Sequence, residues 1–390
     1  MTGASEPGRV GAMRGKLRMM VIAGLLPLAG LGQQAAAAAD PVGEAVSGLT
    51  EEGFPAAVAY ARDGDQDTTY AAGVADTATG REATAGDRFR IASSTKAFTA
   101  TVLLQLAGEG RLSLDDSLAQ WLPDVLTGNG YQPERITLRQ LLNHTSGVHD
   151  PATTPEFFAP YLEEGDRAHV ITPREVIERA EAHGPDFAPG TDVAYSNTGY
   201  LLAGLVIERA TGHPVETEIA RRVLEPLGLH DTSLPRTDPF LHGPHLHGYD
   251  LAGQDMTVFS PSYDWTAGAM VSTVSDLARF QRALFDGELL PPAQQAELRE
   301  VVAAGERQGY GLGVETMQLP CPDGSDRELW GTTGAGPGYY SYAFASADNE
   351  RQLVLATTVY DLAAELRGDG TAPWPASPLA PLTAAFCTDG

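Results

Sequence analysis

Lysine is almost missing from this sequence. The 390 residues contain lysine only at Lys16 and Lys96, and the rest of the 26 basic residues are arginines. Acidic residues number 51, which gives a formal net charge of −25 at pH 7. A chain this acidic lacks the cationic surface that binds phosphate backbones, so the composition excludes a nucleic acid as partner.

Long apolar runs are equally scarce, and the one clear example lies near the start. Four basic residues precede the run Met19–Gly32, and QQAAAAAD follows it with Ala37 and Ala39 in A-x-A spacing. The run contains Pro27 and is shorter than the roughly 20 residues that cross a bilayer. This order predicts a signal peptide over residues 1–39. The mature protein is then secreted, without a stable membrane anchor; the alternative is an uncleaved anchor.

Cysteine occurs only twice, at Cys321 and Cys387. An exported chain meets oxidising conditions, where an even pair of cysteines is typical of a disulfide. The bridge would close a loop of about 65 residues and contribute roughly 4 kcal/mol in the chain-entropy description. The alternative is two unrelated buried thiols.

Strand patterns lie at both ends of the mature chain. GFPAAVAYARDGDQDTTYAAGV alternates apolar and polar residues around Asp63-Gly64, which is typical of a hairpin. ELWGTT, GYYSYAFAS and RQLVLATTVY, near the other end, are rich in aromatic and β-branched residues. Helical spacing fills the middle, and residues 377–387 predict a closing helix.

This order predicts an α+β fold in a single domain over residues 40–390. Both strand groups join one antiparallel sheet, flanked by helices, in a lobe of residues 40–95 and 300–390. Residues 96–299 form a large, mainly helical inserted lobe beside the sheet.

The rare lysine stands in the stretch FRIASSTKAF, three residues after Ser93. Positions i and i+3 share one helix face, so the Ser93 hydroxyl and the Lys96 amine can meet. A serine hydroxyl needs a neighbouring base to become a nucleophile. Arginine keeps its proton, whereas a buried lysine at a helix start can lose it. The pattern therefore predicts a Ser–Lys catalytic pair, against the alternative of a chance S-x-x-K with a surface lysine.

Two later stretches offer partners for this pair. FAPGTDVAYSNTGYLLAG places Tyr195 and Asn197 in a turn before a helix, where a phenol can relay a proton and an amide can hold a substrate amide. WGTTGAGPGYY places Thr332, Thr333 and Gly334 at the end of a strand whose glycines allow close approach to the backbone. Alone, the first could be a capped helix with a core tyrosine, and the second an ordinary hairpin.

In this order the three stretches resemble the active-site serine penicillin-recognising enzymes, which include class C β-lactamases, D-alanyl-D-alanine carboxypeptidases and related esterases. The resemblance spans Gly53 to Cys387 and includes LLNHTSG. It is closest to secreted D-alanyl-D-alanine carboxypeptidases, through GYYSYAFAS, the final AAFC and the two late cysteines.

The resemblance implies a serine hydrolase without a cofactor that works through an acyl-enzyme. Its substrates would be D-Ala-D-Ala-type peptides of peptidoglycan, with β-lactams as inhibitors or substrates. The implied roles are nucleophile for Ser93, general acid and base for Lys96 and Tyr195, and substrate-amide binding for Asn197. The backbone N–H groups of Ser93 and Ala335 would form an oxyanion hole. Thr333 would hydrogen-bond the far end of the substrate, and Thr332 and Gly334 would also belong to the substrate-binding residues.

Two positions depart from the family pattern. Its third motif usually begins with Lys or His, where this chain has Thr332. Similar carboxypeptidases have an arginine on the preceding strand that binds the substrate carboxylate, and the corresponding place here falls near Glu315. These departures leave β-lactamase, esterase or other D-peptidase activity open beside carboxypeptidase activity.

Other classes of function leave weaker signals. LHGPHLHGYD holds His242, His245 and His247 with Asp250 nearby, but the zinc motif H-E-x-x-H does not occur. The G-x-S-x-G elbow of α/β-hydrolases does not occur either. A catalytically silent wall- or penicillin-binding protein on the same fold is the alternative outside enzymology.

Overall fold

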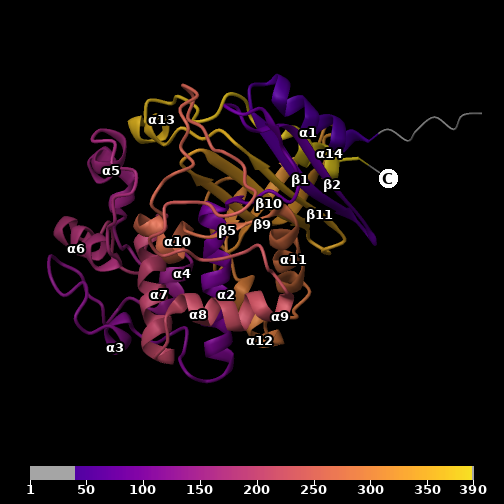
Figure 1. Ribbon diagram of the computed structural model, residues 1–390. Helices are drawn as coiled ribbons and strands as arrows, with labels where there is room; N and C mark the ends of the chain where they lie inside the picture. Colours follow the sequence, from indigo (N-terminus) through magenta and orange to yellow (C-terminus); the bar gives the residue numbers. More distant parts are fainter. Residues whose placement is uncertain (1–39, 389–390) are drawn as a thin grey trace, which may run out of the picture. The chain divides into compact units, whose positions relative to one another are not determined.

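Strands from the two ends of the chain pair side by side in the computed structural model, which describes residues 40–388 (Figure 1). β1 (Ala56–Asp63) pairs antiparallel with β11 (Arg351–Thr357), with Val58 opposite Ala356. The nine-stranded sheet has the order β3-β2-β1-β11-β10-β9-β8-β7-β6. The remaining strands are β2 (Gln66–Asp76), β3 (Arg81–Glu82), β6 (Val302–Ala303), β7 (Gln308–Tyr310), β8 (Glu315–Pro320), β9 (Asp326–Gly336) and β10 (Tyr339–Ser346). The predicted antiparallel sheet is confirmed.

A helical lobe fills the sequence between β3 and β6, as predicted. Its helices are α2 (Thr95–Gly108), α3 (Leu118–Trp121), α4 (Leu138–Leu142), α5 (Pro155–Leu162), α6 (Pro173–His183), α7 (Asn197–Thr211), α8 (Val215–Ile219), α9 (Glu225–Leu227), α10 (Trp265–Gly268), α11 (Val274–Phe285) and α12 (Pro292–Leu298). A two-stranded sheet of β4 (Phe89–Arg90) and β5 (Val271–Ser272) lies among them.

The helix α2 forms the centre of this lobe. Small and apolar side chains cover nearly all of its faces, so it can be enclosed on every side. It packs against α7, α8, α10 and α12, and Figure 1 shows it between the sheet and the outer helices. The start of α2 is therefore held firmly where the sheet and the helical lobe meet.

Two apolar clusters cover the two faces of the sheet. One joins the sheet to the helical lobe, with α11 lying against β1, β10 and β11. The other lies beneath α1 (Pro41–Glu51) and α14 (Ala380–Phe386), which pack on each other. The short helix α13 (Leu362–Arg367) follows β11 and packs against α5.

The predicted disulfide and the predicted closing helix are both present. Cys321, which follows β8, is bonded to Cys387, which follows α14, with 5.4 Å between their Cα atoms. Among residues 40–388, no helix combines the length and the apolar character that a bilayer span requires. The predicted signal peptide, residues 1–39, lies outside the described residues and stays a prediction, as do the domain bounds and the secreted location.

Candidate active site

A tight turn presents Ser93 at the junction of the two lobes. Residues Ala92–Ser94 form a 3₁₀ turn directly before α2, and Ala92 has a φ of 44°, a conformation that non-glycine residues rarely adopt. The strand β9 runs against this turn. A Cβ at Gly334 would lie 2.2 Å from the Ile91 carbonyl oxygen, so only glycine fits there. The structure thus gives Gly334 a contact with the chain's own backbone, and its substrate contact stays a prediction.

Lys96 is buried beside Ser93, with 1% of its surface accessible. Its ammonium donates three hydrogen bonds, to Ser93 Oγ at 3.1 Å, to Asn197 Oδ1 at 2.6 Å and to the Ala267 carbonyl at 2.9 Å. Burial lowers its pKa to about 8, against the smaller opposing effect of nearby carboxylates. A neutral amine is therefore within reach at ordinary pH, as the proposed base requires.

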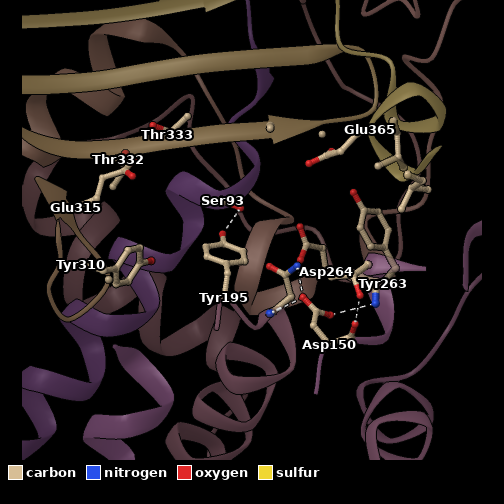
Figure 2. A pocket seen from close by; sticks show the side chains of 18 of the residues that line it. Ser93, Asp150, Tyr195, Tyr263, Asp264, Tyr310, Glu315, Thr332, Thr333 and Glu365 are labelled. Atoms are coloured by element: carbon tan, nitrogen blue, oxygen red, sulfur yellow. Dashed lines mark hydrogen bonds between the residues drawn. The ribbon is translucent and has the colours of Figure 1, made fainter. Parts of the chain in front are cut away.

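Tyr195 lies next to Ser93 (Figure 2), and Lys96 Nζ is 4.7 Å from the centre of its ring. Its hydroxyl donates to Ser93 Oγ at 2.7 Å. Although 46% of the residue surface is accessible, the hydroxyl end faces Ser93, and burial followed by the nearby Tyr310 raises the pKa of Tyr195 well above 10. Tyr195 is therefore a protonated phenol in the resting protein, which can donate a proton but not accept one. This leaves Lys96 as the group that can accept the Ser93 proton.

Asn197 begins α7, and Asp150 fixes its orientation. The backbone N–H and the side-chain Nδ2 of Asn197 both donate to Asp150 Oδ2 at 2.9 Å. This leaves Asn197 Oδ1 to accept from Lys96. Sequence reasoning missed Asp150, although it follows the family stretch LLNHTSG by only three residues.

His144, in the family stretch LLNHTSG, stabilises the turn that carries Tyr195 and Asn197. His144 Nδ1 accepts the backbone N–H of Ser196 at 3.1 Å, which requires an unprotonated Nδ1. Burial, then the charge of Lys96, holds the pKa of His144 well below 6.5, so the ring is neutral. Its ring lies 4.4 Å from that of Tyr195 and 4.3 Å from that of Tyr310, between centroids. His144 therefore positions the turn and has no direct contact with Ser93.

The two threonines of the third stretch are bonded within the protein. Thr332 Oγ1 lies 2.9 Å from Ser94 Oγ, which ties β9 to the turn that carries the nucleophile. Burial raises the pKa of Glu315, and hydrogen bonds from Thr333 oppose that rise. An acidic group thus lies beside Thr333 in the lining of the site, and its correspondence to a carboxylate-binding position stays a prediction.

A cleft of about 490 Å³ opens over Ser93. It brings together Tyr195, Asn197, Thr332, Thr333 and Ala335, whose shared location was predicted from three separate stretches. Four carboxylates also line it, from Asp150, Asp264, Glu315 and Glu365, and no Arg, Lys or His is among the described residues of the lining. The described lining of the cleft is therefore rich in carboxyl groups, and the buried amine of Lys96 lies next to Ser93 at its floor.

The rings of His245 and His247 stack 5.1 Å apart between centroids, but the histidines of the zinc alternative form no group of three ligand atoms within 4.8 Å among the described residues. Each has a different partner: His242 contacts Asp238, His245 contacts the Gly243 carbonyl and His247 contacts Asp255. Among residues 40–388, ligand atoms within 4.8 Å of one another occur instead at His149, His183 and Asp186. None of these three lines the Ser93 cleft.

Known proteins resemble this chain in sequence and in fold. A family model described as Beta-lactamase matches residues 44–372. The chain belongs to the beta-lactamase family of serine hydrolases. Penicillin-binding protein 4* of Bacillus subtilis is a family relative 26% identical over 319 residues, which cover 77% of this chain and 67% of the relative. Protein flp of Staphylococcus aureus is 32% identical over 193 residues, 49% of this chain and 37% of that protein.

Two solved structures resemble this member of the family over most of its length. A D-stereospecific amidohydrolase from Streptomyces sp. has a TM-score of 0.78 and 36% identity, and the match covers 89% of this chain and 98% of that one. A D-amino acid amidase from Ochrobactrum anthropi SV3, complexed with L-phenylalanine amide, has a TM-score of 0.75 and 26% identity, with 89% and 97% covered. The predicted fold class is confirmed by these neighbours.

Proposed function

We propose that this protein is an exported amidohydrolase that cleaves amides of D-amino acids and short D-peptides through an acyl-enzyme on Ser93. The observation that carries the proposal is the acidic cleft, whose described lining includes Glu315 and no Arg, Lys or His. A substrate that ends in a carboxylate would be repelled there, whereas an amide would not. The names of the two structural neighbours support the substrate class and the D configuration.

The geometry supports the following steps. Neutral Lys96 takes the proton of Ser93, whose Oγ attacks the substrate carbonyl carbon. The backbone N–H groups of Ser93 and Ala335 hold the oxyanion. Tyr195 donates its proton to the leaving nitrogen and regains one from Lys96, so the C–N bond breaks and ammonia or an amine departs. Water then attacks the ester carbon, and the acid and Ser93 are released.

A D-alanyl-D-alanine carboxypeptidase is the second candidate. The likeness of GYYSYAFAS and AAFC to secreted carboxypeptidases favours it, as does the similarity to Penicillin-binding protein 4*. In both candidates β-lactams are expected to acylate Ser93. β-Lactamase or esterase turnover would use the same groups.

Four substrates separate the candidates. We expect the purified protein to hydrolyse D-phenylalanine amide but not L-phenylalanine amide. We also expect it to cleave a D-Ala-D-Ala peptide faster when the peptide ends in an amide than when it ends in a free carboxylate. A preference for the free carboxylate would favour the carboxypeptidase. A Glu315→Arg variant should shift the preference toward the carboxylate.

Two controls address the remaining parts of the proposal. A fluorescent penicillin and a fluorophosphonate should label the wild type and not the Ser93→Ala variant. If neither reagent labels the wild type, the silent binding protein is the better explanation. Recovery of the protein from the culture medium tests export, and its confinement to the cells would contradict it. N-terminal sequencing of the recovered protein tests signal cleavage, which a start at Met1 would contradict.

A further inference from the structure

One carboxylate in the cleft has an enclosed oxygen that accepts no hydrogen bond from the described residues. Asp150 accepts from Asn197 and from the Ala152 N–H, Glu315 from Thr333, and Glu365 from the Tyr360 hydroxyl. Asp264 is different. Its Oδ1 is fully enclosed and accepts no hydrogen bond. The charge of Lys96 acts on this carboxylate and opposes the rise of its pKa, but Lys96 donates its hydrogen bonds elsewhere. The four acidic groups therefore divide into three that are satisfied and one that is not.

The fold keeps Asp264 in this position at some cost. Only 6% of its surface is accessible, and burial raises its pKa to about 6, so the group is mostly ionised at neutral pH. A buried charge without a hydrogen-bonding partner is unfavourable, and proteins retain such groups mainly where a ligand satisfies them. In this protein the group also lines the cleft over the nucleophile.

Asp264 is held by the same segment that holds Lys96. It directly precedes α10, and its carboxylate lies against Gly268, where a Cβ would be 1.6 Å from Oδ2. The carbonyl of Ala267, in that helix, accepts a hydrogen bond from Lys96. The Asp264 carboxylate therefore has a fixed place relative to the Lys96 amine. It accepts none of the three hydrogen bonds that this amine donates.

Figure 2 shows Asp264 beside Tyr195, on the side toward Glu365 and Tyr263. Apolar side chains from α5 and α13 line the cleft as well, namely Phe158, Leu362 and Leu366. An anion close to the nucleophile, with an apolar wall nearby, fits a small molecule that has a cationic amine and an apolar side chain near its reactive carbonyl. An α-amino acid amide has this form.

We propose that Asp264 binds the free α-ammonium group of the substrate, so that the protein prefers amino-acid amides and peptides whose first residue is unblocked. The inference rests on the proposed amide hydrolysis. The ammonium donates to the carboxylate in a charge-assisted hydrogen bond, which fixes the carbonyl carbon relative to Ser93. Asp264 thus selects the substrate and takes no part in proton transfer.

A matched pair of substrates tests this role. D-phenylalanine amide and N-acetyl-D-phenylalanine amide differ in the charge and size at the amine. For the Asp264→Asn variant we expect kcat/KM on the free amine to fall roughly 10- to 100-fold, the range for loss of a hydrogen bond to a charged group, and mainly through KM. The acetylated substrate should be unaffected. Glu178→Gln, which alters an exposed carboxylate of α6 outside the cleft, should change neither.

The other outcomes are equally informative. An equal loss on both substrates would mean that Asp264 acts through the charge of Lys96, and no loss would mean that it does not contact the amine. Either result overturns the inference and leaves amide hydrolysis standing.

A competition experiment covers the case in which neither amide is hydrolysed, which defeats the proposed function. D-phenylalanine amide should still slow the labelling of Ser93 by a fluorophosphonate in the wild type, and less so in the Asp264→Asn variant. Equal protection of both proteins would overturn the amine site by itself.

Discussion

Replacing Lys96 by arginine keeps a positive charge beside Ser93 but removes the possibility of losing it. With a pKa of about 8, roughly a tenth of the molecules hold a neutral lysine at pH 7. Arginine holds none, because its guanidinium stays protonated in proteins. General-base catalysis contributes about 10²- to 10⁴-fold, so we expect the acylation rate of Lys96→Arg to fall by that factor.

The measurement is the single-turnover release of p-nitrophenol from an activated ester, followed together with the rate of fluorophosphonate labelling. The larger guanidinium must fit a site that is 1% accessible, so a melting curve is needed to show that the variant is folded. Arg174→Lys is the matched control, since that side chain is 72% exposed on α6. Acylation of folded Lys96→Arg within about threefold of wild type would refute the proton-transfer role.

Four further predictions follow from the same contacts. The acylation rate should rise about tenfold per pH unit up to a pH near 8 and then level off, since Lys96 must be neutral to act; a flat profile from pH 6 to 9 would exclude it as the base. Gly334→Ala should destabilise the fold by about 1–3 kcal/mol and slow the labelling of Ser93, because the new Cβ would clash with the Ile91 carbonyl oxygen. Gly48→Ala is the control: its Cβ would have no atom within 4 Å, so this variant should melt like the wild type. Asp264→Asn should raise the melting temperature at pH 8. Burial raises the pKa of Asp264 from 3.8 to about 6, so keeping this carboxyl group ionised in the folded protein costs about 3 kcal/mol at pH 8. The gain in melting temperature should shrink as the pH falls toward 4, and a gain that does not change with pH would contradict this explanation. EDTA should leave turnover intact, and a loss that zinc restores would argue against a serine mechanism.

Local patterns predicted the contact between Ser93 and Lys96 well. Ser93 and Lys96 lie one helical turn apart, so their contact follows from helix geometry alone. The sequence placed Tyr195 and Asn197 in a turn before a helix, but only the resemblance to a known family predicted that this turn lies next to Ser93. The strand groups were predictable for a similar reason, because alternation of apolar residues marks each of them.

The parts that sequence reasoning missed depend on contacts between irregular segments. Asp264 lies between a short turn and a four-residue helix, where no periodic pattern indicates burial. Asp150 looks like an ordinary acidic residue before a proline until Asn197 is placed against it. The Ser94–Thr332 bond joins residues 238 positions apart. Which carboxylates of the cleft find hydrogen-bond partners is decided by tertiary packing. Residues that are neighbours in the sequence therefore do not predict it.

The place of β11 in the sheet has a consequence for how the protein is made. This strand lies between β1 and β10, so it joins the first strands to the last ones. While the ribosome is still producing the helical lobe, the edge of β1 that will pair with β11 has no partner strand. An unpaired strand edge can form hydrogen bonds with other chains and so promote aggregation. A chain halted before Arg351 would already contain Ser93, Lys96 and Tyr195, yet it would lack the strand that closes the sheet. Synthesis must therefore be nearly complete before the nucleophile has a stable scaffold, and a partner that shields the waiting edge would raise the yield of folded protein.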